Sequence, residues 1–385
     1  MKKYFFYGSS ILFSRGLEYL ILLIAPLYLT KENYGSLEFY KKIIELGAAI
    51  LTFGLPTLIL SYPKSNESKV YFTFISLLFI TGLSIITAPF LNLFNYLFLL
   101  IPIYFHSIFF NNGIIPPFIL THKGSNYASI YKAVISLLFY SIVLITILYS
   151  KEPDFAFVYV SYLLLPLLFC YTIFYVYKNN IIFHTLKRYW FIFKKLIISS
   201  LTIVVSNFAN MMFLYTDILI IKLLSNTADI EIANYSFSLN IANALIIIPL
   251  TLVQVDIEKL KKQIDYFKVL RKKILYLVAS MTLILVMVFL FLTHYYFENY
   301  SSVLYVFLII IAAKFIQAIS VSYGAVVLIK KLFSQNLTIN LSALIANVIL
   351  SYFLYHEFGL IGIALSSLMS LILRFILLVR INNRI

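Results

Sequence analysis

The sequence is poor in charged residues and has a single cysteine. Of its 385 residues, 12% are Asp, Glu, Lys or Arg, about half of the ~25% that soluble domains carry. A water-soluble fold could not cover its surface with so few charges, which excludes a soluble globular domain. Cys170 has no second cysteine to pair with, so a disulfide framework and a cysteine-based zinc site are also excluded.

The signatures of common soluble enzymes are missing as well. The chain contains no P-loop, no Gly-x-Gly-x-x-Gly, no His-Glu-x-x-His and no Gly-x-Ser-x-Gly. Without a nucleotide site, an ATP-driven pump would need a separate subunit. We therefore expect a protein that is not an enzyme and that has no cofactor and no metal site.

Long apolar runs dominate what is present. Apolar residues make up 62% of the chain and occur in continuous blocks near twenty residues, the length that crosses a ~30 Å hydrocarbon core. Because lipid requires every backbone polar group to be paired within the chain, and because the blocks do not alternate, they predict helices. The twelve expected spans are 4–29, 40–62, 70–90, 93–118, 127–149, 155–177, 196–224, 233–255, 274–293, 302–328, 336–354 and 360–380.

The net charge of +15 is distributed unevenly over the connecting segments. With the N-terminus inside, the inner segments hold 21 Lys and Arg residues and the outer ones hold four. This bias predicts that both termini are cytoplasmic. It also explains the basic composition without a nucleic-acid partner, which we do not expect.

A basic segment divides the chain into two halves. Residues 178–195 carry Lys187, Arg188 and Trp190, a pattern typical of an amphipathic linker that binds anionic lipid at the inner leaflet. The predicted domains are therefore a six-helix bundle over 1–177, this linker, and a second six-helix bundle over 196–385. Segments around Lys123 and Lys331 look weakly alike, which suggests a 6+6 pseudo-repeat around a central cavity.

Ionisable residues inside predicted helices are the first candidates for function, since a charge at membrane depth costs at least ~2.5–3.5 kcal/mol. Arg15 and Glu18 share one face of the first helix. They either line a cavity, where Arg would suit a phosphate, or form an ion pair that locks the bundle.

The second predicted helix opens with three charged residues. Lys41 and Glu45 share a face, whereas Lys42 points elsewhere. We assign the two lysines to substrate binding and Glu45 to ion coupling, with snorkelling at the outer boundary as the alternative.

Asp217 and Lys314 are the deepest charges in the second half. Asp217, in the seventh predicted helix, could bind a coupling proton or sodium ion, or pair with Lys222 or Lys314. Lys314, near the middle of the tenth, is a candidate for substrate binding. Helix-embedded cations outnumber anions, seven to three, which favours an anionic substrate. The cations are Arg15, Lys41, Lys42, Lys132, Lys222, Lys314 and Arg374, and the anions are Glu18, Glu45 and Asp217.

Three stretches resemble the polysaccharide, or O-antigen, flippases of the multidrug/oligosaccharidyl-lipid/polysaccharide exporter superfamily. Residues 14–56 hold an Arg-bearing helix, a Tyr-Gly pair that ends at Gly35, and a second helix that ends in Gly-Leu-Pro at Pro56. Residues 213–224 are similar to the family's seventh helix with its Asp. Residues 340–370 are similar to its last two helices, with Asn347 and the Gly-x-x-Gly of Gly359 and Gly362. The chain is shorter than many relatives.

The resemblance implies a MATE-like fold of two bundles in the bacterial inner membrane. It implies a flippase that moves an undecaprenyl-pyrophosphate-linked oligosaccharide from the cytoplasmic to the periplasmic leaflet by alternating access, coupled to H⁺ or Na⁺. Its partners would be this substrate, membrane lipids, and a polysaccharide polymerase with a chain-length regulator. We expect a monomer.

Two other functions stay open. A drug or cation antiporter of the same fold would have a net acidic cavity. A membrane polysaccharide polymerase or ligase would carry a large outer loop with Arg and His, whereas the outer segments here are short.

Overall fold

The structure is a computed structural model of the whole chain. It describes the backbone of residues 2–61, 65–110, 113–178, 183–199, 201–262 and 266–383. Within those helices, the side chains outside the description are 2–12, 15, 61, 167–168, 171–178, 183–184, 199, 202–204, 207, 210–211, 213–214, 254–255, 257–259 and 261–262.

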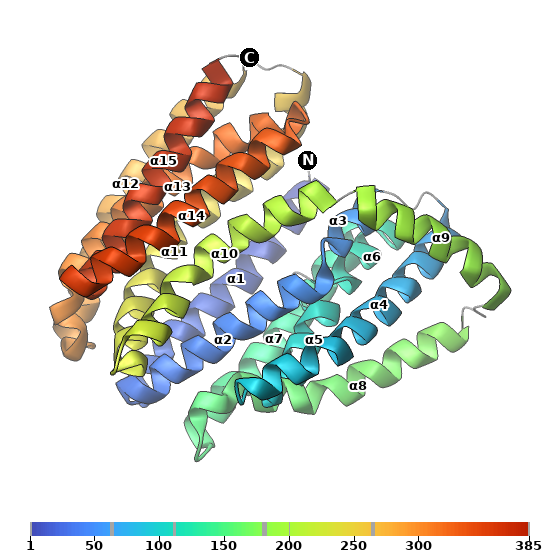
Figure 1. Cartoon of the computed structure of the whole chain (residues 1–385), viewed down its shortest axis with the longest axis horizontal. Helices are drawn as coiled ribbons and strands as arrows, with labels where there is room; N and C mark the ends of the chain where they lie inside the picture. The colour runs from blue at the N-terminus through green and yellow to red at the C-terminus, as the bar shows by residue number, and fades with distance from the viewer. Residues whose placement is uncertain are drawn as a thin grey trace. The chain divides into compact units, whose positions relative to one another are not determined.

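Throughout the described part, the chain is helical and contains no strand (Figure 1). The α-helices are α1 (Lys2–Tyr28), α2 (Lys31–Thr52), α3 (Leu55–Ser61), α4 (Asn66–Leu93), α5 (Leu100–Phe109), α6 (Ile115–His122), α7 (Ser125–Tyr149), α8 (Ala156–Lys178), α9 (Phe183–Ser199), α10 (Leu201–Leu224), α11 (Ala228–Lys262), α12 (Tyr266–Tyr295), α13 (Leu304–Ile329), α14 (Phe333–Phe358) and α15 (Leu360–Asn383). Three short 3₁₀ helices are η1 (Leu97–Leu99), η2 (Pro153–Phe155) and η3 (Glu298–Val303).

The lengths and compositions of these helices fit a protein that crosses a membrane several times. Among the described residues, seven helical segments are long and apolar enough to span a bilayer. They contain α4, α7, α11, α12, α13, α14 and α15, and shorter apolar helices cover 16–28, 97–109 and 153–166. The all-helical prediction is confirmed, while the count of twelve spans stays a prediction.

The first difference from the predicted spans concerns the second helix. It begins at Lys31 rather than at residue 40, so the expected outer loop with Tyr34 and Gly35 is helical and Lys41 lies in the middle of α2. The helix ends where Phe53 and Gly54 adopt positive φ angles of 43° and 72°. Sequence periodicity missed the early start because residues 31–39 are polar and aromatic rather than uniformly apolar.

The second difference concerns the fourth predicted span, which is broken into η1, α5 and α6. Pro116 and Pro117 lie in the first turn of α6, where a missing backbone N–H leaves no helical hydrogen bond unmade. The break expected from these prolines therefore occurs ahead of them, after Phe109.

The basic linker contains a helix, α9, that packs on α4. The Tyr189 ring stacks on that of Tyr71 with centroids 5.0 Å apart, and Phe193 packs on Phe72 at 5.2 Å. Lys187, on the same helix, is exposed. Another basic segment, 256–273, continues α11 to Lys262 and contains the start of α12 at Tyr266.

The chain divides into two compact units. Unit 1 contains residues 1–21 and 40–204, and unit 2 contains residues 22–39 and 205–385. In unit 1, α5 packs on α8 and α6 on α7, around a cluster of aromatic rings that includes the stacked pair Phe105 and Phe139. In unit 2, α13 packs on α11 and α15, and α15 also packs on α14. The predicted domain boundaries at 177 and 196 stay a prediction.

Candidate functional site

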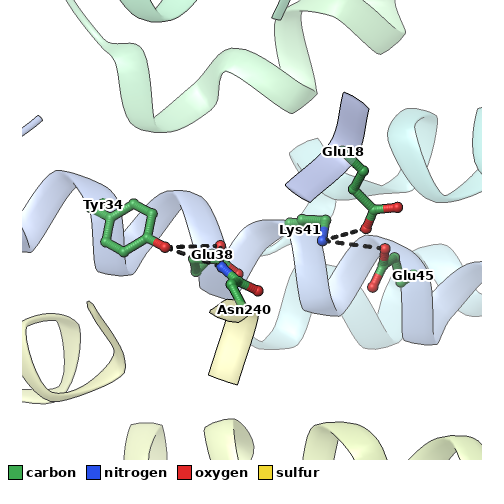
Figure 2. Close-up of polar contacts among 6 residues, drawn as sticks. All are labelled: Glu18, Tyr34, Glu38, Lys41, Glu45 and Asn240. Atoms are coloured by element: carbon green, nitrogen blue, oxygen red, sulfur yellow. Dashed lines mark hydrogen bonds and ion pairs between the residues drawn. The ribbon is translucent and has the colours of Figure 1, made fainter. Parts of the chain in front are cut away.

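Unit 1 holds a buried lysine between two carboxylates. Lys41 of α2 lies with its Nζ 2.7 Å from an oxygen of Glu18 on α1 and 3.6 Å from an oxygen of Glu45 one turn along α2 (Figure 2). The side chains of Lys41 and Glu18 are 4% and 3% exposed, and that of Glu45 is 17% exposed. The lysine predicted to bind substrate is therefore charge-compensated within its own unit.

The i,i+4 spacing of Lys41 and Glu45 produced the contact that the sequence predicted, since both side chains project from one face of α2. The contact to Glu18 was not foreseen, because it joins two helices. Arg15, the expected partner of Glu18, falls outside the described residues. Lys42 is 8% exposed and lies in the same helix. Substrate binding by Glu18, Lys41 and Lys42 stays a prediction.

His106 is a residue of this region that sequence reasoning missed. It is 6% exposed in α5, and it is close enough to Glu45, Glu18 and Lys41 to interact with their charges. Its ring packs edge-on against Phe139 with centroids 5.3 Å apart. A lone histidine in an apolar run gives no signal of such neighbours, because they come from other helices.

Unit 2 holds a buried carboxylate that neutral donors surround. Asp217 of α10 is 6% exposed. Its Oδ1 accepts a hydrogen bond from Asn347 Nδ2 of α14 at 3.0 Å, and its Oδ2 accepts from Ser367 Oγ of α15 at 2.6 Å. The hydroxyl of Tyr235 on α11 donates to the same Oδ2. Four helices thus meet at one carboxylate, and hydrogen bonds of this kind stabilise its charged form.

A second layer of hydrogen bonds orients Asn347, which was predicted as a structural residue. Its Oδ1 accepts from Ser366 Oγ at 3.3 Å, and Ser351 and Ser366 hydroxyls lie 2.5 Å apart. The side chain of Asn347 is fully buried. Asn347 is therefore held with its amide N–H directed at Asp217, which connects a residue of the resemblance to the predicted ion-coupling residue.

A small cavity lies beside Asp217. Its polar wall is made of Asp217, Tyr235, Ser367 and Lys314. The cavity volume is about 10 Å³. This is the room that one water molecule needs, and a small monovalent cation is of similar size. Lys314 Nζ donates to Gln317 Oε1 at 3.2 Å, one turn along α13. The site could hold a proton, a water or one small cation, whereas the described residues contain no group of three His, Cys, Asp or Glu side chains that could hold a metal ion.

Of the two lysines suggested as partners of Asp217, one pairs with another carboxylate and one lies in the Asp217 cavity. Lys222 bonds Asp229 at 2.7 Å, with both side chains about one-third exposed, so the pairing of Asp217 with Lys222 is wrong. Lys314 lines the same cavity as Asp217. Tyr235 and Ser367 were missed, because Tyr and Ser are too common in this sequence to mark a site. Arg374, the last embedded cation, donates from Nε to Asn340 Oδ1 at 3.1 Å.

Two of the three glycines named by the resemblance, Gly35 and Gly362, lie at close helix contacts in unit 2. A Cβ on Gly35 would be 1.7 Å from the backbone oxygen of Asp229, and one on Gly362 would be 2.0 Å from that of Leu354. Gly359 is the C-cap of α14, and Pro56 is the second residue of α3, two residues after Gly54. The close approach at Gly362 brings α15, and with it Ser367, against α14 and Asn347.

The fold is similar to that of solved transporter structures. The chain superposes on the lipid II flippase MurJ in its inward closed conformation with a TM-score of 0.71 and 16% identity, over 98% of this chain and 87% of that one. It superposes on an inward-facing multidrug resistance MATE family transporter of the MOP superfamily with a TM-score of 0.63 and 14% identity, over 96% of this chain and 95% of that one.

Neither protein-family models nor curated proteins match the sequence. The structural likeness shows that the chain has the same all-helical fold as these two proteins.

Proposed function

We propose that this protein is a flippase that moves a lipid-linked oligosaccharide from the cytoplasmic to the periplasmic leaflet, by alternating access and with a cation bound at Asp217 as the coupling ion. The observation that carries the proposal is the likeness, over nearly the whole chain, to a flippase for lipid II. The substrate class would be a polyprenyl-pyrophosphate-linked repeat unit for O-antigen or capsule, in the bacterial inner membrane.

The charges of the described residues support an anionic substrate. Lys42 and Lys314 are both more than 90% buried. In a fold of transporters, cations at membrane depth suit a pyrophosphate or an acidic sugar. Lys41 fits this role less well, because Glu18 and Glu45 balance its charge.

The Asp217 site supports ion coupling. Three neutral donors bond the carboxylate, which lines a cavity with room for about one water molecule. Binding of an ion there would change the charge at a point where α10, α11, α14 and α15 meet. An ion can shift a transporter between conformations only if it binds one of them better, and a junction of four helices is a place where such a difference can arise.

The test uses a strain that lacks the gene and is complemented with variants. Wild type should restore surface polysaccharide and clear lipid-linked repeat units from the cytoplasmic leaflet. Lys314→Ala and Asp217→Ala should fail at both while still reaching the membrane. Lys151→Ala, which removes an exposed lysine between α7 and α8, is the matched control and should complement fully.

Other outcomes would contradict the proposal. If repeat units reach the periplasm in the deletion strain and only polymerisation fails, the protein is a polymerase or ligase rather than a flippase.

A second candidate function is that of a drug or cation antiporter, which the likeness to a multidrug MATE transporter favours. That function predicts altered drug sensitivity on deletion with normal surface polysaccharide.

A further inference from the structure

A second buried carboxylate in unit 2, Glu38 of α2, is surrounded differently from Asp217. Its side chain is fully buried. Its Oε1 accepts hydrogen bonds from Asn240 Nδ2 of α11 at 2.6 Å and from the hydroxyl of Tyr34 at 3.4 Å (Figure 2). Asn240 Nδ2 also lies 3.1 Å from the Tyr34 hydroxyl. Both donors to Glu38 therefore bond the same carboxylate oxygen, Oε1.

The neighbouring oxygens are buried without hydrogen-bond partners. Among the described residues, this applies to Glu38 Oε2, Asn240 Oδ1, the Tyr300 hydroxyl of η3 and Ser236 Oγ of α11. Each of these four residues is at most 3% exposed. Buried polar atoms in proteins nearly always have a partner, and a group of orphaned ones indicates a bound water or ion.

Their placement brings these residues into one region. Tyr300 packs edge-on against Tyr34 with centroids 6.5 Å apart, and its ring stacks on that of Phe237 at 4.4 Å, which ties η3 to α11. Ser236 precedes Asn240 by four residues and therefore lies on the same face of α11. Glu38 follows Tyr34 by one turn on α2.

In the described part of the chain, no ion pair includes Glu38. The contrast is with Glu18, which has Lys41 at 2.7 Å. Lys31, a cation near this region, donates to the backbone oxygen of Asn299 at 2.7 Å and lies 4.8 Å from the Tyr300 ring centroid. Lys222 is bonded to Asp229. An ionised carboxylate out of water needs a positive partner.

We propose that Glu38, Asn240, Tyr300 and Ser236 bind a monovalent alkali cation at a site distinct from that of Asp217. The ligand atoms are all oxygens, which is the set that hard cations prefer. One carboxylate balances one positive charge, whereas a divalent ion would require further carboxylates. A proton would neutralise Glu38 but would leave the hydroxyls of Tyr300 and Ser236 unpaired.

The two sites are separated by the geometry of α11. Tyr235, which bonds Asp217, and Asn240, which bonds Glu38, are five residues apart, so they point in directions ~140° apart around the helix axis. Asp217 has three donors on its two oxygens, while Glu38 leaves one oxygen bare. Cation binding at Glu38 does not depend on which substrate is transported.

The experiment measures thermal unfolding of the purified full-length protein in detergent while NaCl or KCl replaces N-methylglucamine chloride at constant ionic strength. The background is Asp217→Asn, which removes the carboxylate proposed to bind the coupling ion. A ligand that binds only the folded state raises the unfolding midpoint with its concentration. We expect this rise to persist in Asp217→Asn and to vanish in Asp217→Asn/Glu38→Gln.

Two further variants keep the test decisive. Glu32→Gln in the same background makes the same charge change at an exposed position of α2 and should leave the rise intact. Tyr300→Phe keeps the ring but removes one oxygen, and it should raise the cation concentration at half-effect roughly threefold to tenfold. If the Asp217→Asn/Glu38→Gln protein does not fold, the change in the half-effect cation concentration of Tyr300→Phe tests the proposal instead.

The proposal is overturned if the Asp217→Asn protein shows no cation dependence, or if Glu38→Gln leaves that dependence unchanged. It is also overturned if stability responds to pH but not to Na⁺ or K⁺ and Glu38→Gln abolishes the pH response. That last result would assign a proton to Glu38.

Discussion

The two units bury a carboxylate in different ways. In unit 1, Glu18 meets the ammonium group of Lys41, and the charges cancel within the protein. In unit 2, Asp217 meets the N–H and O–H groups of Asn347, Ser367 and Tyr235, which stabilise the negative charge without cancelling it. The first arrangement is complete, so it suits a fixed structural role. The second leaves a charge beside a cavity, so it can respond to a cation.

The largest expected effect separates these two arrangements. Lys41→Met should lower the free energy of unfolding by about 3–5 kcal/mol, because it removes the ammonium group 2.7 Å from the buried Glu18 carboxylate. Thermal unfolding in detergent micelles measures the loss. Adding Glu18→Gln should recover a large part of it, since the buried carboxylate is then replaced by a neutral amide. A Lys41→Met protein as stable as wild type would show that the other interactions of Glu18 are enough to hold its charge.

Removal of one hydrogen-bond donor to Asp217 should lower the free energy of unfolding by less than Lys41→Met does. Tyr235→Phe deletes a hydroxyl that bonds a buried carboxylate, and the expected cost is about 1.5–3 kcal/mol. Tyr235→Phe should also restore less surface polysaccharide in the complementation assay. The Lys41–Glu18 ion pair should keep its contribution to stability. Tyr159→Phe, which removes an exposed tyrosine hydroxyl bonded to Glu152, is the control and should be near neutral. Equal effects of the two variants would argue against a special role for the Asp217 network.

A steric change should disturb unit 2 without changing any charge. Gly362→Ala would place a Cβ against the backbone of Leu354, forcing α15 away from α14, with an expected cost of about 1–3 kcal/mol. Gly324→Ala on α13 is the matched control, because a Cβ there meets nothing within 4 Å. Unfolding midpoints and complementation compare the two. If Gly362→Ala is as active as Gly324→Ala, the Asn347–Asp217–Ser367 geometry does not require this close approach.

The smallest effect is expected at an ion pair of the ordinary surface kind. Lys222 and Asp229 are about one-third exposed, so solvent screens their attraction. Lys222→Met should cost no more than about 1 kcal/mol, well below Lys41→Met, when both are measured in the same thermal assay. A loss as large as that of Lys41→Met would mean that burial does not set the difference between the two pairs.

Sequence reasoning located several residues of the site but few of their partners. Asp217 stood out as a carboxylate in an apolar run, and Lys41 and Glu45 as an i,i+4 pair, because both signals are local. The Lys41–Glu18 contact and the Tyr235 and Ser367 bonds to Asp217 each join different helices, so no spacing in the sequence predicts them. His106 was missed for the same reason, whereas Glu38 was missed because the second helix was predicted to begin at residue 40 rather than at Lys31.

The sequence by itself determined that the chain is a set of membrane-spanning helices, because run length and hydrophobicity act within one segment. It also placed Glu18, Lys41, Asp217 and Lys314 inside helices, where all four are buried, but it left Glu38 between two predicted spans. The tertiary structure decided which of these charges are cancelled, which are hydrogen-bonded and which are left bare. That outcome depends on which helix faces meet, and helix packing between distant segments is a property of the folded chain rather than of any one helix.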